Sequence, residues 1–318
     1  MPAPPKQPHN FREILEQVWW RLDLALDEET IHWSAMLGAA EALMCGTTGI
    51  VDHHESPGFI EGSLDLVADA CATVGVRVNC SYGVTDRHGA EAGRRGLQEN
   101  ERFLSAGGRG MVGVHAAFTC SDDLLEGAAD LAKRMGTGVH IHVGEGTDDR
   151  DAAKRLESLA DDDWLLVHCV HLDRELRGTI AHNPRSNMNN AVGYAAPSTR
   201  SNTVVLGTDG IGADMLEELR FAYVALRAHD VTETPETSWS WLENGWKLIP
   251  EARTDVVEWN YDHADSPWHV AFTPGVRALN VSTAAGEMLL VDGRPTRIDI
   301  DEVRAKAAES ARRLFAKL

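Results

Sequence analysis

Five short apolar runs in this chain each stop at a histidine or an aspartate. The residues at these stops are His115, His142, His168, His182 and Asp209. When parallel strands alternate with helices, the carboxyl ends of the strands face the same side, so polar residues at those ends converge on one pocket. Several imidazoles and a carboxylate in one pocket are typical of a site in which a metal ion activates water. The pattern therefore predicts an α/β barrel with a metal site at its C-terminal strand ends.

Strand-like and helical segments alternate over most of the chain. The strand-like runs are GIVD (49–52), VRVNC (76–80), MVGVH (111–115), VHIHV (139–143), WLLVH (164–168), TIAH (179–182) and VVLGTD (204–209). Helical spacing is found over 11–45, with a break near Asp27, and over 61–74, 90–104, 122–135 and 151–160. This alternation predicts parallel β/α units, one strand short of a closed (β/α)8 barrel. Between residues 171 and 178 there is no room for a full helix.

The pattern changes beyond about residue 245. Short β-like pieces follow, namely DVVEWN, RALNV and EMLLVDGRPT, and a helical segment over 301–318 ends the chain. We therefore expect residues 1–245 to form the barrel and residues 246–318 to form a small β appendage with a C-terminal helix.

Composition limits the partners that this protein can have. The net charge of −19 over 318 residues would repel nucleic acids and anionic membranes. The five cysteines are odd in number and form no CxxC motif, which indicates reduced thiols. The first ten residues are Pro-rich without the apolar stretch of a signal peptide, and no run is long enough to span a membrane. A cytoplasmic protein is expected.

HIHVGE (140–145) is the segment richest in chemistry. Alternation along a strand places His140 and His142 on the same face. Glu145 follows just beyond the strand end, where its carboxyl group can face the same pocket and serve as a proton shuttle. Adjacent residues on a strand point to opposite faces, so at most one of His53 and His54 can face that pocket.

HNPRSNMNN (182–190) has the composition of a loop, because a residue before proline favours an extended or turn conformation. Arg185, Ser186 and Asn187 either contact substrate or hold this loop in place. The chain contains no GxSxG, no P-loop and no GxGxxG after a strand, so serine hydrolases, NTPases and dinucleotide-binding enzymes find no support.

Taken together, GTTGIVDHH, VHIHVGEG, VHCVHLD, AHNPRSN and LGTDG resemble the amidohydrolase superfamily. The resemblance is to its chlorohydrolase/aminohydrolase branch, which includes cytosine, guanine and adenosine-derivative deaminases and s-triazine hydrolases. It runs from about residue 11 to 225 and resumes in the last fifty residues. It implies a distorted (β/α)8 TIM-like barrel that binds one Zn²⁺ or Fe²⁺ ion.

The resemblance also implies roles for individual residues. His142 and Asp209 would bind the metal, with His168 as a further candidate ligand. Asp209 would also take a proton from the activated water, Glu145 would shuttle that proton, and His168 would hydrogen-bond the attacking water. His115 and His182 are the expected substrate contacts. The substrate would be a small heterocycle carrying an amino group, neither nucleic acid nor membrane would be a partner, and a homodimer is compatible with such barrels.

The chain departs from the family pattern at its start. The family takes two further metal ligands from an HxH motif on its first strand, and Met1 falls in what resembles the loop after that strand. The resemblance therefore implies that the first strand and HxH are absent and that the appendage is truncated. Retention of Glu145 and Asp209 favours a metal-dependent hydrolase acting on C–N bonds other than peptide bonds. The alternatives are a metal-free remnant or binding protein of the same fold, and a dechlorinating hydrolase.

Overall fold

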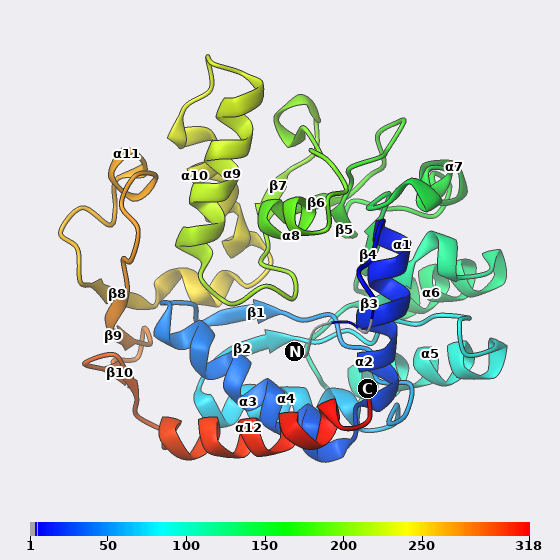
Figure 1. The fold of residues 1–318 in the computed structure, drawn as a ribbon, viewed down its shortest axis with the longest axis horizontal. Helices are drawn as coiled ribbons and strands as arrows, with labels where there is room; N and C mark the ends of the chain where they lie inside the picture. Colours follow the sequence, from blue (N-terminus) through cyan, green and yellow to red (C-terminus); the bar gives the residue numbers. More distant parts are fainter. Residues whose placement is uncertain (1–3, 5) are drawn as a thin grey trace.

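The computed structural model describes residue 4 and residues 6–318, and part of the lead-in expected over residues 1–10 lies outside them. The barrel is built from seven parallel strands (Figure 1). They are β1 (Gly49–Val51), β2 (Arg77–Asn79), β3 (Val112–Ala116), β4 (Val139–Val143), β5 (Leu165–His168), β6 (Thr179–His182) and β7 (Val204–Leu206). The fold class expected from the sequence is confirmed.

The strands follow chain order around the barrel. β1 pairs with β2, and β3 to β7 form a five-stranded sheet. Parallel bridges between Cys80 and Gly110 and between Val84 and Val114 join the two groups. Gly113 is required at this junction, because a Cβ there would come within 2.4 Å of the Tyr82 carbonyl oxygen.

Helices cover the outside of the barrel. They are α3 (Glu28–Met44), α4 (Ser63–Val74), α5 (Ala90–Ser105), α6 (Asp122–Met135), α7 (Ala152–Leu156), α9 (Met215–His229) and α10 (Pro235–Asn244). The break expected near Asp27 is the start of α3, where the Asp27 side chain and Thr30 form a capping box. The part of the chain that the structure describes contains no helix with the length and apolarity of a membrane span.

Alternation along the strands separates two sets of apolar side chains. Leu165, Val167, Ala181 and Val205 point into the barrel and form one cluster. The residues between them on the same strands, such as Leu166 and Ile180, pack outward in the main core against the helices. Polar residues in phase with the inner set therefore face the barrel interior.

A non-strand segment lies between β7 and the β1–β2 pair. The Asn244 side chain donates to the Val204 carbonyl at 2.9 Å, and Asn79 donates to the Leu248 carbonyl at 3.1 Å. Leu248 packs against the inner cluster, and Ile249 contacts Gly49. The segment over residues 244–249 thus covers the interior at the strand starts.

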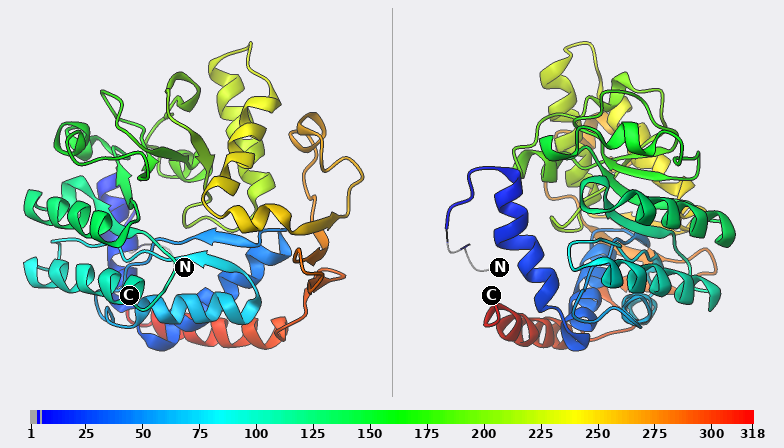
Figure 2. Two further views of the ribbon diagram at one scale, coloured as in Figure 1. Left: turned by 180° about the vertical axis from the view of Figure 1, so that it is seen from behind. Right: turned by 90° about the vertical axis from the view of Figure 1, so that its right-hand side faces the viewer.

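The N-terminal helix lies against the opposite end, where the strands finish. It consists of α1 (Phe11–Ile14), a π-helical turn (Leu15–Trp19) and α2 (Trp20–Ala25). Figure 2 shows it as a separate layer on one side of the barrel. Phe11 packs against Gly146 and Trp19 against Gly210, both of which follow barrel strands.

The appendage is an antiparallel sheet followed by a long helix. Its strands are β8 (Val256–Trp259), β9 (Ala278–Ser282), β10 (Met288–Val291) and β11 (Arg294–Pro295), and α11 (Pro267–Val270) lies in the β8–β9 connection. The C-terminal helix α12 (Ile300–Phe315) runs along α3 (Figure 1). Asp255 ties the appendage to the barrel through a buried ion pair with Arg77 of β2.

The prediction of a loop over residues 182–190 is wrong in one respect. Residues Pro184–Asn189 form a short helix, α8. Asn183 before the proline is not helical, as expected, but proline at the first helical position needs no hydrogen-bond partner for its nitrogen and favours a helix start.

Candidate metal and active site

Three of the predicted site residues meet at the C-terminal ends of the strands. Glu145, His168 and Asp209 each present one potential ligand atom, and these atoms lie within 4.8 Å of one another. The His168 Nε2 atom is 3.4 Å from Glu145 Oε2 and 3.9 Å from Asp209 Oδ2. Residues that follow three different strands are thus brought together, as the sequence pattern predicted.

His142 lies beside this group with a fixed tautomer. Its ring centroid is 5.4 Å from that of His168. Its Nδ1 lies 2.7 Å from the His115 carbonyl oxygen, which can only accept, so Nδ1 carries the proton and Nε2 keeps its lone pair. His142 therefore presents a nitrogen that can bind a metal ion.

His168 reaches the pocket through an unusual backbone conformation. Strand alternation would send its side chain outward, since Leu165 and Val167 of β5 point inward. Its φ of 71° and that of Cys169, 55°, place both residues in the left-handed region, which turns the chain at the strand end. Asp209 also has a positive φ, 52°. Strain of this kind concentrates at functional sites.

Helix α8 and Asn190, the residue that follows it, hold all three residues of the group. The Asn187 Oδ1 atom accepts from His168 Nδ1 at 2.8 Å, Asn190 donates to Glu145 Oε1 at 3.2 Å, and Ser186 donates to Asp209 Oδ2. The helix is anchored by Arg185, which pairs with the buried Glu218 of α9. The sequence left open whether Arg185, Ser186 and Asn187 contact substrate or hold the segment. The structure places them as supports of the site, and the role of Asn190 was missed.

Burial sets the protonation of the group. It raises the pKa of Glu145 to about 7, with a smaller contribution from Asp209. Burial also acts on Asp209, but His168, His142 and the hydrogen bonds from Ser186 and Gly210 outweigh it and lower the pKa of that carboxyl. Burial lowers the pKa of His168 and of His142, so both rings are neutral and able to act as ligands near pH 7.

His115 lines the same pocket. Its Nδ1 contacts Thr119 Oγ1 at 2.7 Å, and that hydroxyl donates to the Ala116 carbonyl, so the ring nitrogen is the donor. A small cavity is enclosed by side chains of the N-terminal helix and of the strand ends. Its lining residues are Phe11, Leu15, His115, Ala116, Phe118, His142, Glu145 and Asp149.

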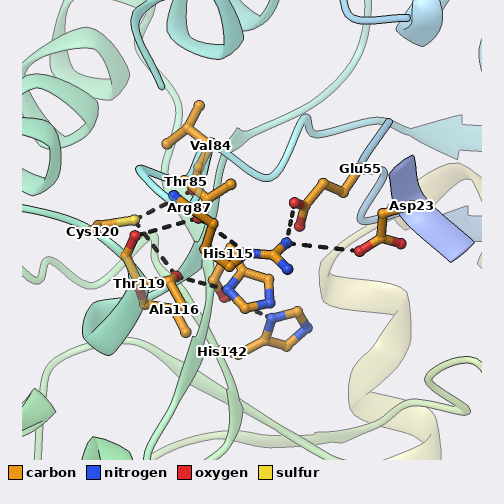
Figure 3. Close-up of polar contacts among 10 residues, drawn as sticks. All are labelled: Asp23, Glu55, Val84, Thr85, Arg87, His115, Ala116, Thr119, Cys120 and His142. Atoms are coloured by element: carbon orange, nitrogen blue, oxygen red, sulfur yellow. Dashed lines mark hydrogen bonds and ion pairs between the residues drawn. The ribbon is translucent and has the colours of Figure 1, made fainter. Parts of the chain in front are cut away.

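A buried charged cluster adjoins His115. Figure 3 shows the Arg87 guanidinium between Glu55 and Asp23, close to His115. Arg87 pairs with Glu55 and lies 3.7 Å from Asp23, and its guanidinium carbon is 4.4 Å from the Trp20 ring centroid. Burial raises the pKa of Asp23 to about 7 and that of Glu55 to about 8. No sequence pattern indicated this cluster, because its members are far apart in the chain.

His182 is not brought to the group. It lies in phase with Ile180, which packs outward, and its ring is 5.8 Å from that of Trp241 on α10 and 6.1 Å from that of Tyr194. Burial, with a smaller contribution from His168, lowers the pKa of His182 to about 3. These contacts place the ring in the packing around the barrel, and the role of His182 in substrate binding stays a prediction.

The donors fit a divalent metal ion. Neutral imidazole nitrogens and carboxylate oxygens are ligands that Zn²⁺ and Fe²⁺ accept. The carbonyl that orients His142 and the amide that orients His168 are the outer-shell partners that metal-binding histidines usually have. His142, His168 and Asp209 could hold the ion, with Glu145 beside it.

Sequence comparisons relate the chain to known proteins. The sequence model described as "Amidohydrolase family" matches residues 6–243. The chain is 35% identical to a 5'-deoxyadenosine deaminase of Methanopyrus kandleri, over 94% of this chain and 80% of the relative. It is 29% identical to a 5-methylthioadenosine/S-adenosylhomocysteine deaminase of Desulfitobacterium hafniense, over 92% and 78%.

Solved structures share the fold. An adenosine deaminase from Xanthomonas campestris with bound zinc superposes with a TM-score of 0.84 at 20% identity, covering 98% of this chain and 81% of that chain. A zinc complex of an atrazine chlorohydrolase from Arthrobacter aurescens gives a TM-score of 0.79 at 19% identity, covering 95% and 82%.

Proposed function

Because the chain belongs to the amidohydrolase family, we propose that it is a metal-dependent aminohydrolase that deaminates an adenosine-type nucleoside. The observation that carries this proposal is the convergence of Glu145, His168 and Asp209 on one point, with His142 beside it. Deamination is favoured because the relatives that match most of this chain are named as deaminases of adenosine derivatives. Further parts of the proposal are a single Zn²⁺ or Fe²⁺ ion and a cytoplasmic location.

The site residues divide the chemistry among them. His142 and Asp209 would hold the ion, with His168 as a further candidate ligand. Bound there, a divalent ion would lower the pKa of a water molecule to about 7 and supply a nucleophile at neutral pH. His115, at the adjoining wall of the cavity, would contact the substrate.

Proton transfer is assigned to the two carboxyl groups. Asp209, whose low pKa keeps it ionised, accepts a proton from the attacking water. Glu145, with a pKa of about 7, is partly protonated near neutral pH and can donate to a ring nitrogen of the heterocycle. Ionised by that donation, Glu145 takes up the proton of the newly formed hydroxyl group and passes it to the departing amino group, and the proton held by Asp209 then restores Glu145. The C–N bond breaks, a C–O bond forms, and ammonia leaves.

The test is turnover on a panel of heterocycles. The purified chain, supplied with Zn²⁺ or Fe²⁺, is incubated with 5'-deoxyadenosine, 5-methylthioadenosine and adenosine, and with guanine, cytosine and a chlorotriazine as comparators. We expect ammonia release from the adenosine derivatives and loss of that turnover in Glu145→Gln. Chloride release alone would identify a dechlorinating enzyme. Failure on every compound, with metal bound or not, would favour a binding protein.

A further inference from the structure

His53 is a buried imidazole without a hydrogen-bond partner. It follows β1, and neither of its ring nitrogens has a partner among the described residues. The next residue, His54, faces the other way, with its Nε2 at 2.8 Å from Ser56 Oγ and its ring beside Tyr82 of the outer core. Leaving a buried polar atom unpaired destabilises the folded state, so such an atom needs a partner of some kind.

The ring of His53 lies among the inward-facing histidines. Its centroid is 4.5 Å from that of His142 and 4.7 Å from that of His140. Gly83 leaves the space that this ring occupies, because a Cβ at that position would come within 2.5 Å of His53 Nε2. An ordinary side chain at Gly83 would displace His53 from the other two histidines.

The neighbouring rings are oriented as ligands. The Ser81 hydroxyl group donates its proton to the Asp52 carbonyl oxygen. The Ser81 oxygen therefore accepts a hydrogen bond from His140 Nδ1, at 3.1 Å. His140, like His142, therefore keeps the lone pair of Nε2. His53 differs from both, since no hydrogen bond to a described residue fixes its ring.

We propose that His53 is a further imidazole ligand of the divalent ion in this pocket. The proposal rests on the proposed function only for the presence of that ion. Catalytic zinc sites usually have three protein ligands, so His142 and Asp209 leave a position for which His53 and His168 are the candidates. The ring of His53 lies next to that of His142, with the centroids 4.5 Å apart, so one ion can lie between the two imidazoles.

An alternative explanation is that His53 only fills space in the barrel. A space-filling histidine would tolerate replacement by a side chain of similar size without any effect on metal binding. His54 offers a matched control, because it is the adjacent residue on the same segment and faces away from the pocket.

The experiment compares metal binding by the wild-type chain, His53→Ala, His53→Gln and His54→Ala. Each protein is stripped with a chelator, its fold is checked by circular dichroism, and its Zn²⁺ affinity is measured by competition with a chromophoric chelator. Loss of a ligand should exceed the 10–100-fold effect of an outer-shell change, so we expect about 100-fold weaker binding in both His53 variants. The Zn²⁺ affinity of His54→Ala should stay within about threefold of that of the wild-type chain, because His54 lies outside the pocket.

Spectroscopy gives a second measurement that needs no substitution. In the cadmium-loaded wild-type chain, NMR should show coupling between the metal and a ring nitrogen of His53. Unchanged affinity in the His53 variants, absence of that coupling, or failure of the wild-type chain to bind any ion would overturn the proposal. Metal binding that depends on His53 without deamination would leave this inference standing and refute the proposed function. Deamination with normal metal binding in the His53 variants would refute this inference and leave the proposed function standing.

Discussion

The two halves of the barrel mouth differ in how their proposed ligands and charged groups are held. On the β4–β7 side, Glu145, His168 and Asp209 each have a hydrogen-bond partner from α8 or from Asn190, the residue after it. On the β1–β3 side, the ring of His53 lacks a hydrogen bond within the described residues, as does the Nη1 atom of Arg87. The three site residues of the first half are therefore held in place by the protein, whereas these two groups of the second half are left for a bound ion, water or substrate to satisfy.

This difference indicates which site residues are held in position before a ligand binds. Preorganised donors cost no rearrangement when the reaction begins. Unsatisfied buried groups are tolerated only if something else compensates for them. We therefore expect substitutions on the β4–β7 side to affect catalysis together with metal binding, and substitutions on the β1–β3 side to affect stability or the binding of the ion or the substrate.

Replacing Asp209 should have the largest effect. Asp209→Asn removes both the proposed ligand charge and the proposed base, so turnover should fall by about a thousandfold or more, and metal content should fall with it. Both are measured on the same sample, by ammonia release and elemental analysis. Wild-type metal content in the variant would contradict the ligand role.

Arg87→Met tests the β1–β3 side. Removing the cation leaves the buried Glu55 and Asp23 without a counter-charge, which costs about 3–5 kcal/mol in comparable buried pairs. Urea denaturation should show this as a lower free energy of unfolding. Equal stability of variant and wild type would show that the carboxyl groups simply become protonated in the fold.

Asn187→Ala should weaken metal binding while preserving the fold. His168 loses the acceptor that orients its ring, and loss of an outer-shell partner typically costs about 10–100-fold in affinity or activity. Met188→Ala, at an exposed position on the same helix, is the matched control. The interpretation of α8 as a support would fail if both variants behaved alike in metal titrations.

Asp52→Asn should change how stability depends on pH. Burial raises the pKa of Asp52 to about 6, so the folded state holds the proton more tightly than the unfolded chain does. The resulting stabilisation is complete below the unfolded pKa of about 4 and is lost as the pH rises through about 6. The variant should therefore be more stable than wild type by about 1–3 kcal/mol near pH 8 and not near pH 4. Parallel pH profiles for the two proteins would contradict this.

His182→Phe should have the smallest effect on catalysis. Its ring faces Trp241 outside the barrel, so kcat/KM should stay within about threefold of wild type, as for a change that removes no transition-state contact. A large rise in KM would support the contact between His182 and the substrate that was predicted from the sequence.

Much of the site could be predicted from strand periodicity. Alternation placed His140 and His142 on one face and separated His53 from His54, because side chains on a strand have a period of two. The same rule also describes His182, which ends a strand in phase with outward-facing residues. It fails for His168, which is turned inward by a positive φ that no sequence pattern encodes.

Long-range contacts were beyond sequence reasoning. The partners of α8 and the Asp23–Arg87–Glu55 cluster depend on how distant segments pack, and composition alone favoured a loop over 182–190. The division into residues 1–245 and 246–318 stays a prediction. Arg77 and Asp255 join the two parts in the structure.

The central claim is that His142 and Asp209 hold a divalent ion at the C-terminal ends of the barrel strands. Anomalous diffraction at the zinc absorption edge, from crystals of the zinc-loaded protein, tests it most directly. We predict a peak about 2.0–2.2 Å from His142 Nε2 and from an Asp209 carboxylate oxygen, typical distances for zinc. A map with no peak in this pocket, or with zinc bound only at surface histidines, would contradict the account.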